Sequence, residues 1–303
     1  PTTAFGETFQ YSNLMVAAGG YVATHSAFLN KPLDAAYDAA MNREVVGPLK
    51  MIDIMFDMKR GASGNFAMPH GQGLSETMAY EPLAVTTEGA VSAVRPAGGA
   101  WSTVRDLARY VEMELAQGVV DGKTYVSKGN LLKRRTPQIR MTAVATYGLG
   151  LFVTNENELP MLGHGGNTIG FTSDLFMFPE HDIGVVVLSN AGQANDFRDA
   201  LQRRFIELMF DGKPEALETL TGAVARDIKS VKESKALFAA VPNDAWMKSL
   251  VGTYQNASLG TIEVKAQGKG FILDAGEWQA AVGEMHDRDG TVKLVTMGVP
   301  IVG

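Results

Sequence analysis

The sequence GHGGNTIGFTSDLFMFPEHDIGVVVLSN occupies residues 163–190 and carries the strongest fold signal in the chain. Two of its runs, residues 171–178 and 182–190, are rich in the β-branched and aromatic residues that favour strands. A short PEHD turn separates them, so they predict an antiparallel hairpin. The segment His164-Gly165-Gly166-Asn167 is expected to precede the first of these strands.

Helices are predicted on both sides of the hairpin. Residues 14–49 contain an Ala-rich stretch and then apolar residues at helical spacing, which predict two helices, the second stopping at Gly47-Pro48. Thr103 and Asp106 have capping-box spacing and open a helix that ends near Gly118. Its predicted apolar face consists of Val104, Leu107, Ala108, Val111 and Leu115.

Other segments complete the pattern. YGLGLFV (147–153) predicts a further strand, whereas residues 56–98 are rich in Gly, Pro, Ser and Asn and predict loop with short strands. Asn195 is expected to start a helix that ends before Gly212. The residues expected on the buried face of that helix are Phe197, Leu201, Phe205, Leu208 and Met209.

These elements predict an α+β fold, an antiparallel sheet flanked by helices with a helical subdomain, over residues 1–213. Residues 214–243 are polar and Ala-rich and predict a helical connector. Residues 244–303 contain short strand-like pieces separated by Gly-containing turns, which predict a small antiparallel β domain, a barrel or sandwich. The sequence leaves open whether that domain is complete.

Composition excludes several classes of protein. The 303 residues carry a net charge of −6 with acids and bases mixed along the chain, so nucleic acid is not an expected partner. No apolar run is long enough for a membrane span. The chain has no cysteine, which excludes disulfides, thiolate zinc sites and a cysteine nucleophile. The histidines lack metal-binding spacing, so neither a metal nor another cofactor is predicted.

Two short motifs could carry chemistry. In Tyr11-Ser12-Asn13, the phenol could move a proton if a nearby cation lowered its pKa, and the amide of Asn13 could bind a substrate. In His164-Gly165-Gly166-Asn167, the glycines would let the backbone approach a ligand with its N–H groups free. Alone, each motif has a simpler structural interpretation, a helix start with a capping Asn and a Gly-rich turn with a bystander histidine.

Taken together, the motifs resemble the serine β-lactamase and penicillin-binding-protein superfamily, in the branch of class C β-lactamases, D-aminopeptidases and related esterases. The resemblance covers about residues 5–210 in five ordered stretches. These are GETFQYSN (6–13), VVGPLKM (45–51), RPAGGAWSTVRDLARYV (95–111), YGLGLFV (147–153) and residues 163–190. It implies a β-lactamase/transpeptidase-like fold, and it favours a periplasmic or secreted location, although the absence of cysteine suits the cytoplasm equally.

The resemblance also implies roles for individual residues. Tyr11 matches the family's proton-transfer tyrosine and Asn13 its substrate-contacting amide. His164, Gly165 and Gly166 take the place of a Lys-Thr-Gly or His-x-Gly strand, with Asn167 N–H as one oxyanion donor. His164 in place of lysine favours an esterase, amidase or peptidase over a dedicated β-lactamase, although a β-lactam substrate stays open. Where the family usually reads PLGM, this chain reads PLKM (48–51), with Lys50 in place of the glycine.

The family's Ser-x-x-Lys nucleophile motif is missing, because no serine in the chain has a lysine three residues on. We therefore expect the nucleophile on a segment upstream of Pro1, and residues 1–303 alone to be inactive. Two alternatives stay open. The protein could be a non-catalytic homologue that binds a ligand in the retained cleft, or one half of a two-chain enzyme whose N-terminal fragment carries Ser-x-x-Lys. If the protein is a hydrolase, as one chain or as two, its expected partner is a small-molecule or peptide substrate.

The tail from about Asp244 resembles the small lipocalin-like domain that follows the catalytic domain in some of these hydrolases. This resemblance rests on LVGTYQN (250–256) and on the strand pattern. It implies a role in shaping the cleft, in association or in structure alone.

Overall fold

The computed structural model describes residues 3–4, 6–73, 77–156, 158–239, 242–256, 260–276 and 279–297. It divides into two compact units. Unit 1 comprises residues 1–70 and 83–198, and unit 2 comprises residues 71–82 and 199–303. The domain limits that the sequence predicted, after residues 213 and 243, differ from the limits of these two units. They remain predictions.

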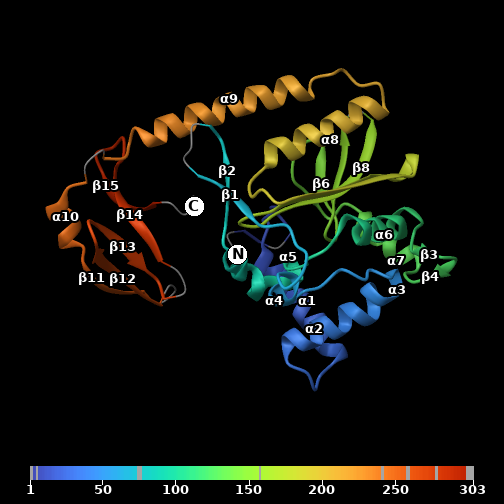
Figure 1. The fold of residues 1–303 in the computed structure, drawn as a ribbon. Helices are drawn as coiled ribbons and strands as arrows, with labels where there is room; N and C mark the ends of the chain where they lie inside the picture. The colour runs from blue at the N-terminus through green and yellow to red at the C-terminus, as the bar shows by residue number, and fades with distance from the viewer. Residues whose placement is uncertain are drawn as a thin grey trace. The chain divides into compact units, whose positions relative to one another are not determined.

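Unit 1 is built on a six-stranded antiparallel sheet in the order β10-β9-β8-β7-β6-β5 (Figure 1). Its strands are β5 (Ile139–Arg140), β6 (Ala145–Tyr147), β7 (Phe152–Glu156), β8 (Leu159–Asn167), β9 (Thr172–Phe178) and β10 (Ile183–Ser189). The predicted hairpin is confirmed as β9 and β10, which pair from Phe178–Ile183 to Thr172–Ser189. The α+β fold class is therefore confirmed.

One face of this sheet is covered by helix α6 (Val104–Leu115), which packs on β10. The approach is close, since a Cβ added to Gly184 of β10 would lie 2.2 Å from Val111 Cγ1. On β9, the strand next to β10, Phe176, Met177 and Phe178 are fully buried. Burial of consecutive residues means that both faces of β9 are covered.

The other helices of unit 1 form a helical subdomain around a second core. They are α1 (Asn13–Ala27), α2 (Leu33–Met41), the π-helical turn η1 (Asn42–Val46), α3 (Gly47–Leu49), α4 (Met58–Gly61), the 3₁₀ segment η2 (Val85–Val94), α5 (Arg95–Gly98) and α7 (Lys128–Arg135). Short strands β3 (Val119–Val120) and β4 (Lys123–Thr124) pair between α6 and α7, and η3 (Pro179–His181) joins β9 to β10. The core contains Tyr37, Val46, Leu49, Met51, Phe56, Met113, Val120 and Leu131. Helices α4, η2 and α5 lie where loop with short strands was predicted, so that expectation was partly wrong.

The predicted helix stop at Gly47-Pro48 was wrong, because the helical path continues to Leu49. The π turn before it lets Gly47 N–H reach Asn42 C=O, directly ahead of Pro48, which has no N–H to donate. The path ends at Lys50, whose φ of 56° and ψ of 40° are left-handed. This conformation suits the glycine that the family usually has here.

Replacing Lys50 by glycine is expected to stabilise the protein by up to about 1 kcal/mol, because the left-handed strain of about 1–2 kcal/mol outweighs the added entropy cost of glycine. A thermal scan should show a rise in Tm of roughly 1–4 °C. Lys50→Ala is the control, since it removes the exposed Lys50–Asp121 ion pair but keeps the Cβ. A glycine variant no more stable than the alanine variant would contradict this explanation.

The start of α6 was predicted in part. Thr103 Oγ1 accepts the N–H of Asp106 at 3.3 Å, as the capping pattern requires. The Asp106 carboxylate, however, accepts the N–H of Asp53 at 2.7 Å and is buried, so it anchors the segment after α3. Val104, which was expected on the buried face, is half exposed.

Two glycine-containing segments of the sheet were predicted only in part. YGLGLFV is the hairpin between β6 and β7, because Gly150 takes a φ of 73° and turns the chain. His164-Gly165-Gly166-Asn167 precedes β9 as expected, but it also forms the last four residues of a strand that was not predicted, β8. Pairing with β9 holds these glycines extended despite their low strand propensity.

Unit 2 contains a five-stranded antiparallel sheet in sequential order, with β11 and β15 at its edges. Its elements are α9 (Ala216–Lys235), α10 (Asp244–Ser249), β11 (Gly252–Asn256), β12 (Gly260–Gln267), β13 (Gly270–Asp274), β14 (Gln279–His286) and β15 (Val292–Met297). The predicted small antiparallel β domain is confirmed, but within the described ranges its strands form one open sheet and not the predicted barrel or sandwich. The predicted connector contains α9, and the chain end at Gly303 lies outside the described residues. Strands β1 (His70–Gln72) and β2 (Tyr80–Pro82) form a separate two-stranded sheet.

Helix α8 (Asn195–Met209) starts where the sequence predicted, but its predicted buried face was only partly right, because, of the residues expected there, Leu201 and Phe205 alone are half-buried. Phe197, Leu208 and Met209 are half or more exposed. Glu207 is buried instead, because its carboxylate accepts the N–H groups of Glu215 and Ala216 at 2.7 and 2.8 Å. This contact caps the start of α9 and turns the Glu207 side of α8 inward.

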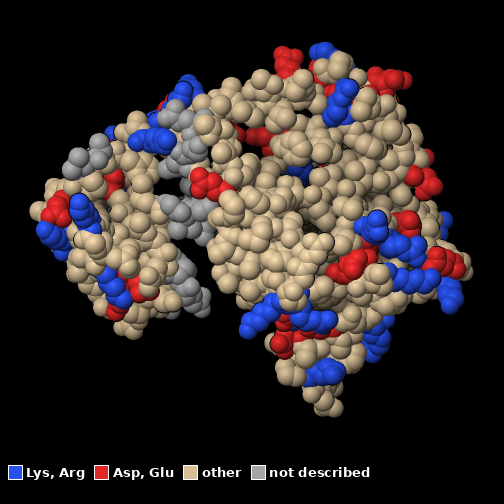
Figure 2. All heavy atoms as spheres, in the orientation of Figure 1, with Lys and Arg blue, Asp and Glu red and all other residues tan. Residues whose placement is uncertain are grey.

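On the visible surface, Lys and Arg side chains alternate with Asp and Glu side chains (Figure 2). Such interspersed charge matches the mixed charge pattern of the sequence. None of the helices in the described ranges is both long and apolar enough to cross a membrane.

Candidate active site

An aromatic cluster in unit 1 brings the two sequence motifs together. It consists of Phe9, Tyr11, Tyr147, Phe152 and His164. The ring centroids of Tyr11 and His164 are 6.0 Å apart, and Tyr11 meets Tyr147 edge-on at 6.3 Å. Phe152 stacks on His164 at 4.7 Å, and Phe9 lies 5.3 Å from Tyr147. Tyr11 remains 49% exposed, so its phenol is open to a substrate.

The two ring nitrogens of His164 have different partners. Nδ1 lies 2.6 Å from the carbonyl oxygen of Gly165, and Nε2 lies 3.0 Å from the hydroxyl of Tyr147. A carbonyl oxygen can only accept, so Nδ1 carries the proton. In the neutral ring Nε2 is then an acceptor, and the Tyr147 hydroxyl donates to it.

Burial sets the protonation of the cluster. It lowers the pKa of the His164 imidazole, and the hydrogen bond to Gly165 offsets part of this effect. Burial also raises the pKa of Tyr11, and it raises the pKa of Tyr147 with a further contribution from Tyr11. At neutral pH all three groups are therefore uncharged. Among the described residues, no cation offsets the raised pKa of Tyr11.

The end of β8 offers an open edge beside this cluster. Pairing with β7 stops at Phe152–Gly163, while pairing with β9 continues to Asn167–Thr172. Thr168 N–H donates to Phe171 C=O in the turn to β9. Because the direction of backbone N–H groups alternates along a strand, those of Gly165 and Asn167 point away from β9. This edge has no strand partner in the part of the chain that the structure describes.

The two glycines of β8 lie close to side chains of neighbouring elements. A Cβ on Gly165 would lie 2.8 Å from Arg198 Nη1, and one on Gly166 would lie 2.8 Å from Ser173 Oγ. The side chain of Asn167 is held on the Arg198 side of the sheet, where its amide donates to Asn195 at 2.8 Å and accepts from Thr172 at 2.8 Å. Asn167 thus offers a ligand its backbone N–H.

A buried carboxylate fixes the turn after β8. Glu88 of η2 is 1% exposed and accepts the N–H of Gly170 at 2.6 Å. His70 N–H donates to the carbonyl of the same glycine at 3.3 Å. The position of the open edge therefore depends on residues from two separate segments, one at Glu88 and one at His70.

The Tyr11-Ser12-Asn13 motif lies at the start of α1. Ser12 is the N-cap, because its hydroxyl accepts the N–H of Met15 at 3.3 Å. Asn13 is the first helical residue and its side chain is exposed. The structural alternative, in which the asparagine caps the helix, was therefore wrong, and the amide of Asn13 is available to a ligand.

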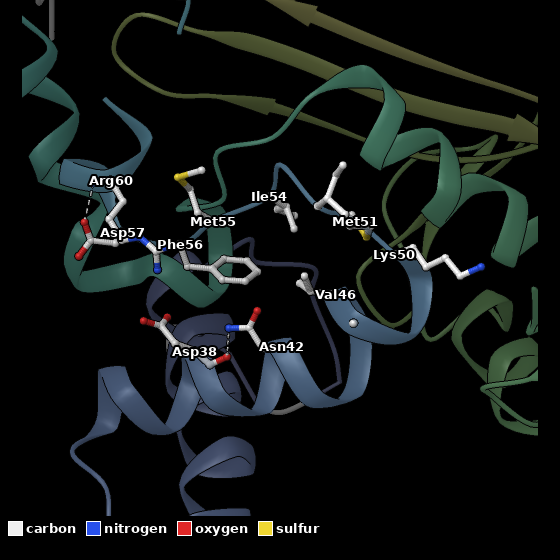
Figure 3. Close-up of a pocket in the computed structure, with 12 residues that line it drawn as sticks. Asp38, Asn42, Val46, Lys50, Met51, Ile54, Met55, Phe56, Asp57 and Arg60 are labelled. Carbon is white, nitrogen blue, oxygen red and sulfur yellow. Dashed lines mark hydrogen bonds between the residues drawn. The ribbon is translucent and has the colours of Figure 1, made fainter. Parts of the chain in front are cut away.

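A cavity of about 490 Å³ lies in the helical subdomain and does not include the aromatic cluster (Figure 3). Three of the charged side chains that line it, Asp38, Lys50 and Asp57, already have partners within the protein. Asp57 accepts the N–H of Arg60, Lys50 pairs with Asp121, and Asp38 pairs with Arg95. Volume alone therefore does not make it the functional site. Among the described residues, no three His, Asp or Glu side chains come together as a metal-binding group.

The family model for Beta-lactamase matches residues 1–208 of the chain. The chain belongs to the Beta-lactamase family. Both motifs and the whole aromatic cluster fall within the matched residues, and the members of this family are serine hydrolases. Comparison with curated proteins found no match.

Solved structures share the fold of this Beta-lactamase family member. The octameric penicillin-binding protein homologue from Pyrococcus abyssi is 20% identical over 97% of this chain and 64% of its own, with a TM-score of 0.50. A penicillin binding protein from Bacillus halodurans is 15% identical over 66% of this chain and 57% of its own, with a TM-score of 0.52. A D-stereospecific amidohydrolase from Streptomyces sp. is 22% identical over 63% of this chain and 53% of its own, with a TM-score of 0.50. The chain thus spans 53–64% of the length of these three structures.

Sequence reasoning missed Tyr147 as part of the site. The residue opens the stretch YGLGLFV, which was interpreted as a strand without a role for its first side chain. Its link to His164 depends on pairing, because Tyr147 lies opposite Phe152, and Phe152 lies opposite Gly163. An aromatic residue two strands away from a histidine gives no local signal in the sequence.

Proposed function

We propose that the chain is the larger part of a serine hydrolase that forms an acyl-enzyme on an ester, amide or peptide. The observation that carries this proposal is the position of Tyr11 beside His164 and the open edge of β8. A proton-transfer group and backbone donors then lie on two sides of one space. Acyl transfer needs both.

In this mechanism a serine hydroxyl attacks the carbonyl carbon, forming the acyl C–O bond. The carbonyl oxygen becomes an oxyanion that accepts from Asn167 N–H, and loss of one such donor typically costs about 10²–10³ in rate. Collapse of this intermediate breaks the ester or amide bond, and the serine proton reaches the leaving group through Tyr11. Water then hydrolyses the acyl-enzyme, and Asn13 binds the substrate.

We place the nucleophile outside residues 1–303, because no Ser-x-x-Lys occurs within them. Two features of unit 1 favour an added segment at this site. The raised pKa of Tyr11 calls for a cation, which the lysine of Ser-x-x-Lys would supply. In addition, α1 exposes Leu14, Met15 and Val22 by 72%, 69% and 71%, although an uncharged helix that is apolar on all sides is normally buried.

The missing serine equally favours a second candidate, a non-catalytic homologue that binds a ligand in the same space. The gene sequence upstream of Pro1 and the intact mass of the purified protein separate the two. A Ser-x-x-Lys in the same reading frame supports the hydrolase, and a second polypeptide in the preparation supports the two-chain form. An upstream sequence without the motif would overturn the hydrolase proposal.

A fluorophosphonate probe gives the direct test. Treatment of the complete protein should label the serine of Ser-x-x-Lys, and replacement of that serine by alanine is the matched control. Residues 1–303 alone should stay unlabelled and should not turn over an activated ester. An adduct on any serine within residues 1–303 would contradict the proposed position of the nucleophile.

A further inference from the structure

The hydroxyl of Tyr147 reinforces the tautomer that Gly165 C=O sets on His164, because a phenol O–H is a good donor and the unprotonated Nε2 a good acceptor. As a donor to Nε2 at 3.0 Å, it occupies the lone pair there and leaves Nδ1–H to donate to Gly165. The Tyr147 ring also packs against Phe152 at 5.2 Å, and Phe152 stacks on His164. Both rings are thus held in place while they make this hydrogen bond.

The Nδ1–H bond changes the polarity of the open edge of β8. This edge presents the N–H and C=O groups of both Gly165 and Asn167, all pointing away from β9. The carbonyl of Gly165 would repel a developing oxyanion. Since His164 Nδ1–H satisfies that carbonyl at 2.6 Å, the edge keeps two N–H donors and one open acceptor, the C=O of Asn167.

We propose that Tyr147 is a positioning residue that, together with Gly165 C=O, locks His164 in the neutral Nδ1–H tautomer, so that this carbonyl stays covered and Asn167 N–H faces the substrate carbonyl. The catalytic consequence rests on the proposed hydrolase function, whereas the tautomer itself does not. In the resting site His164 is then an orienting group, because its Nε2 lone pair is already engaged.

The tautomer can be measured on residues 1–303 by NMR with ¹⁵N-labelled histidine. The chain has five histidines, and His164→Gln assigns the resonances of His164. We expect a protonated Nδ1 and a hydrogen-bonded, unprotonated Nε2. In Tyr147→Phe the Nε2 resonance should move towards that of a free acceptor nitrogen, and the Nε2–H tautomer should become populated.

Tyr254→Phe is the matched control, since it also removes one phenol hydroxyl, which donates to Leu250 C=O in unit 2. It should leave the His164 resonances unchanged. An Nε2–H tautomer in the unmodified protein, or identical His164 resonances in Tyr147→Phe, would overturn the proposal. If Tyr147→Phe does not fold, 3-fluorotyrosine labelling replaces it. The more acidic phenol should strengthen the bond and shift Nε2 in the opposite direction, and an unchanged Nε2 would overturn the proposal.

Kinetics of the complete protein separate this inference from the proposed function. Tyr147→Phe should lower the acylation rate about 10-fold, the effect of one hydrogen bond, while the fold is retained. If the complete protein has no hydrolase activity but the NMR shift occurs, the proposed function fails and the tautomer lock stands. If activity is present and the His164 resonances do not respond to Tyr147→Phe, the tautomer lock fails alone.

Discussion

Replacing Tyr11 by phenylalanine in the complete protein is expected to slow acyl-enzyme formation by a factor on the order of 10² or more. The change keeps the ring that packs near Tyr147 and His164 and removes the hydroxyl that moves the proton. Because Tyr11 is half exposed, little packing energy should be lost. The effect should therefore appear in the rate of the chemical step and not in stability.

Burst kinetics with an activated ester would measure the acylation rate of the Tyr11 variant directly. A thermal scan of the same variant should give a Tm close to that of the unmodified protein. Tyr254→Phe again serves as the control, because its hydroxyl lies in unit 2, and it should acylate at the normal rate. Unchanged acylation in Tyr11→Phe would remove this residue from the mechanism.

The parts of the fold that were predictable carry a local pattern. The β9–β10 hairpin has two apolar runs with a short turn between them, and α6 has a cap and an amphipathic face. In both cases neighbouring residues along the chain determine the structure. The family resemblance likewise rested on ordered local motifs, and the match over residues 1–208 confirmed it.

The end of β8 was not predictable because its strand conformation depends on distant residues. Gly165 and Gly166 have no side chains to favour a strand, and the side chains that lie closest to them, Arg198 and Ser173, belong to other elements. The direction of the Asn167 side chain is set in the same way, by Asn195. Partners such as these become neighbours only after the sheet has formed, so spacing along the sequence cannot reveal them.

A buried ion network joining α6 to α7 was also invisible in the sequence, and it gives the largest expected effect on stability. Glu114 of α6 is fully buried. Its carboxylate accepts from the Tyr110 hydroxyl at 2.8 Å and pairs with the guanidinium groups of Arg134 and Arg135. Burial and the negative charge of Glu114 raise the pKa of Tyr110, so the phenol stays a donor.

Replacing Glu114 by alanine is expected to lower the free energy of unfolding by about 3–5 kcal/mol. The loss is large because Arg135, whose side chain is only 10% exposed, would keep its charge without a counter-ion, and Arg134 would lose its carboxylate partner as well. Glu114→Gln keeps hydrogen-bonding atoms without the charge and should fall between the alanine variant and the unmodified protein. Urea unfolding followed by far-UV circular dichroism measures the differences.

Glu112 provides the matched comparison on the same helix. Its carboxylate also pairs with an arginine, Arg109, at 2.8 Å, but its side chain is 60% exposed. Because exposed ion pairs contribute roughly 0–1 kcal/mol, Glu112→Ala should change stability little. If both alanine variants lost the same small free energy of unfolding, the Glu114 network would not hold α7 against α6. A large loss confined to Glu114 would show that burial makes the carboxylate essential to this part of the fold.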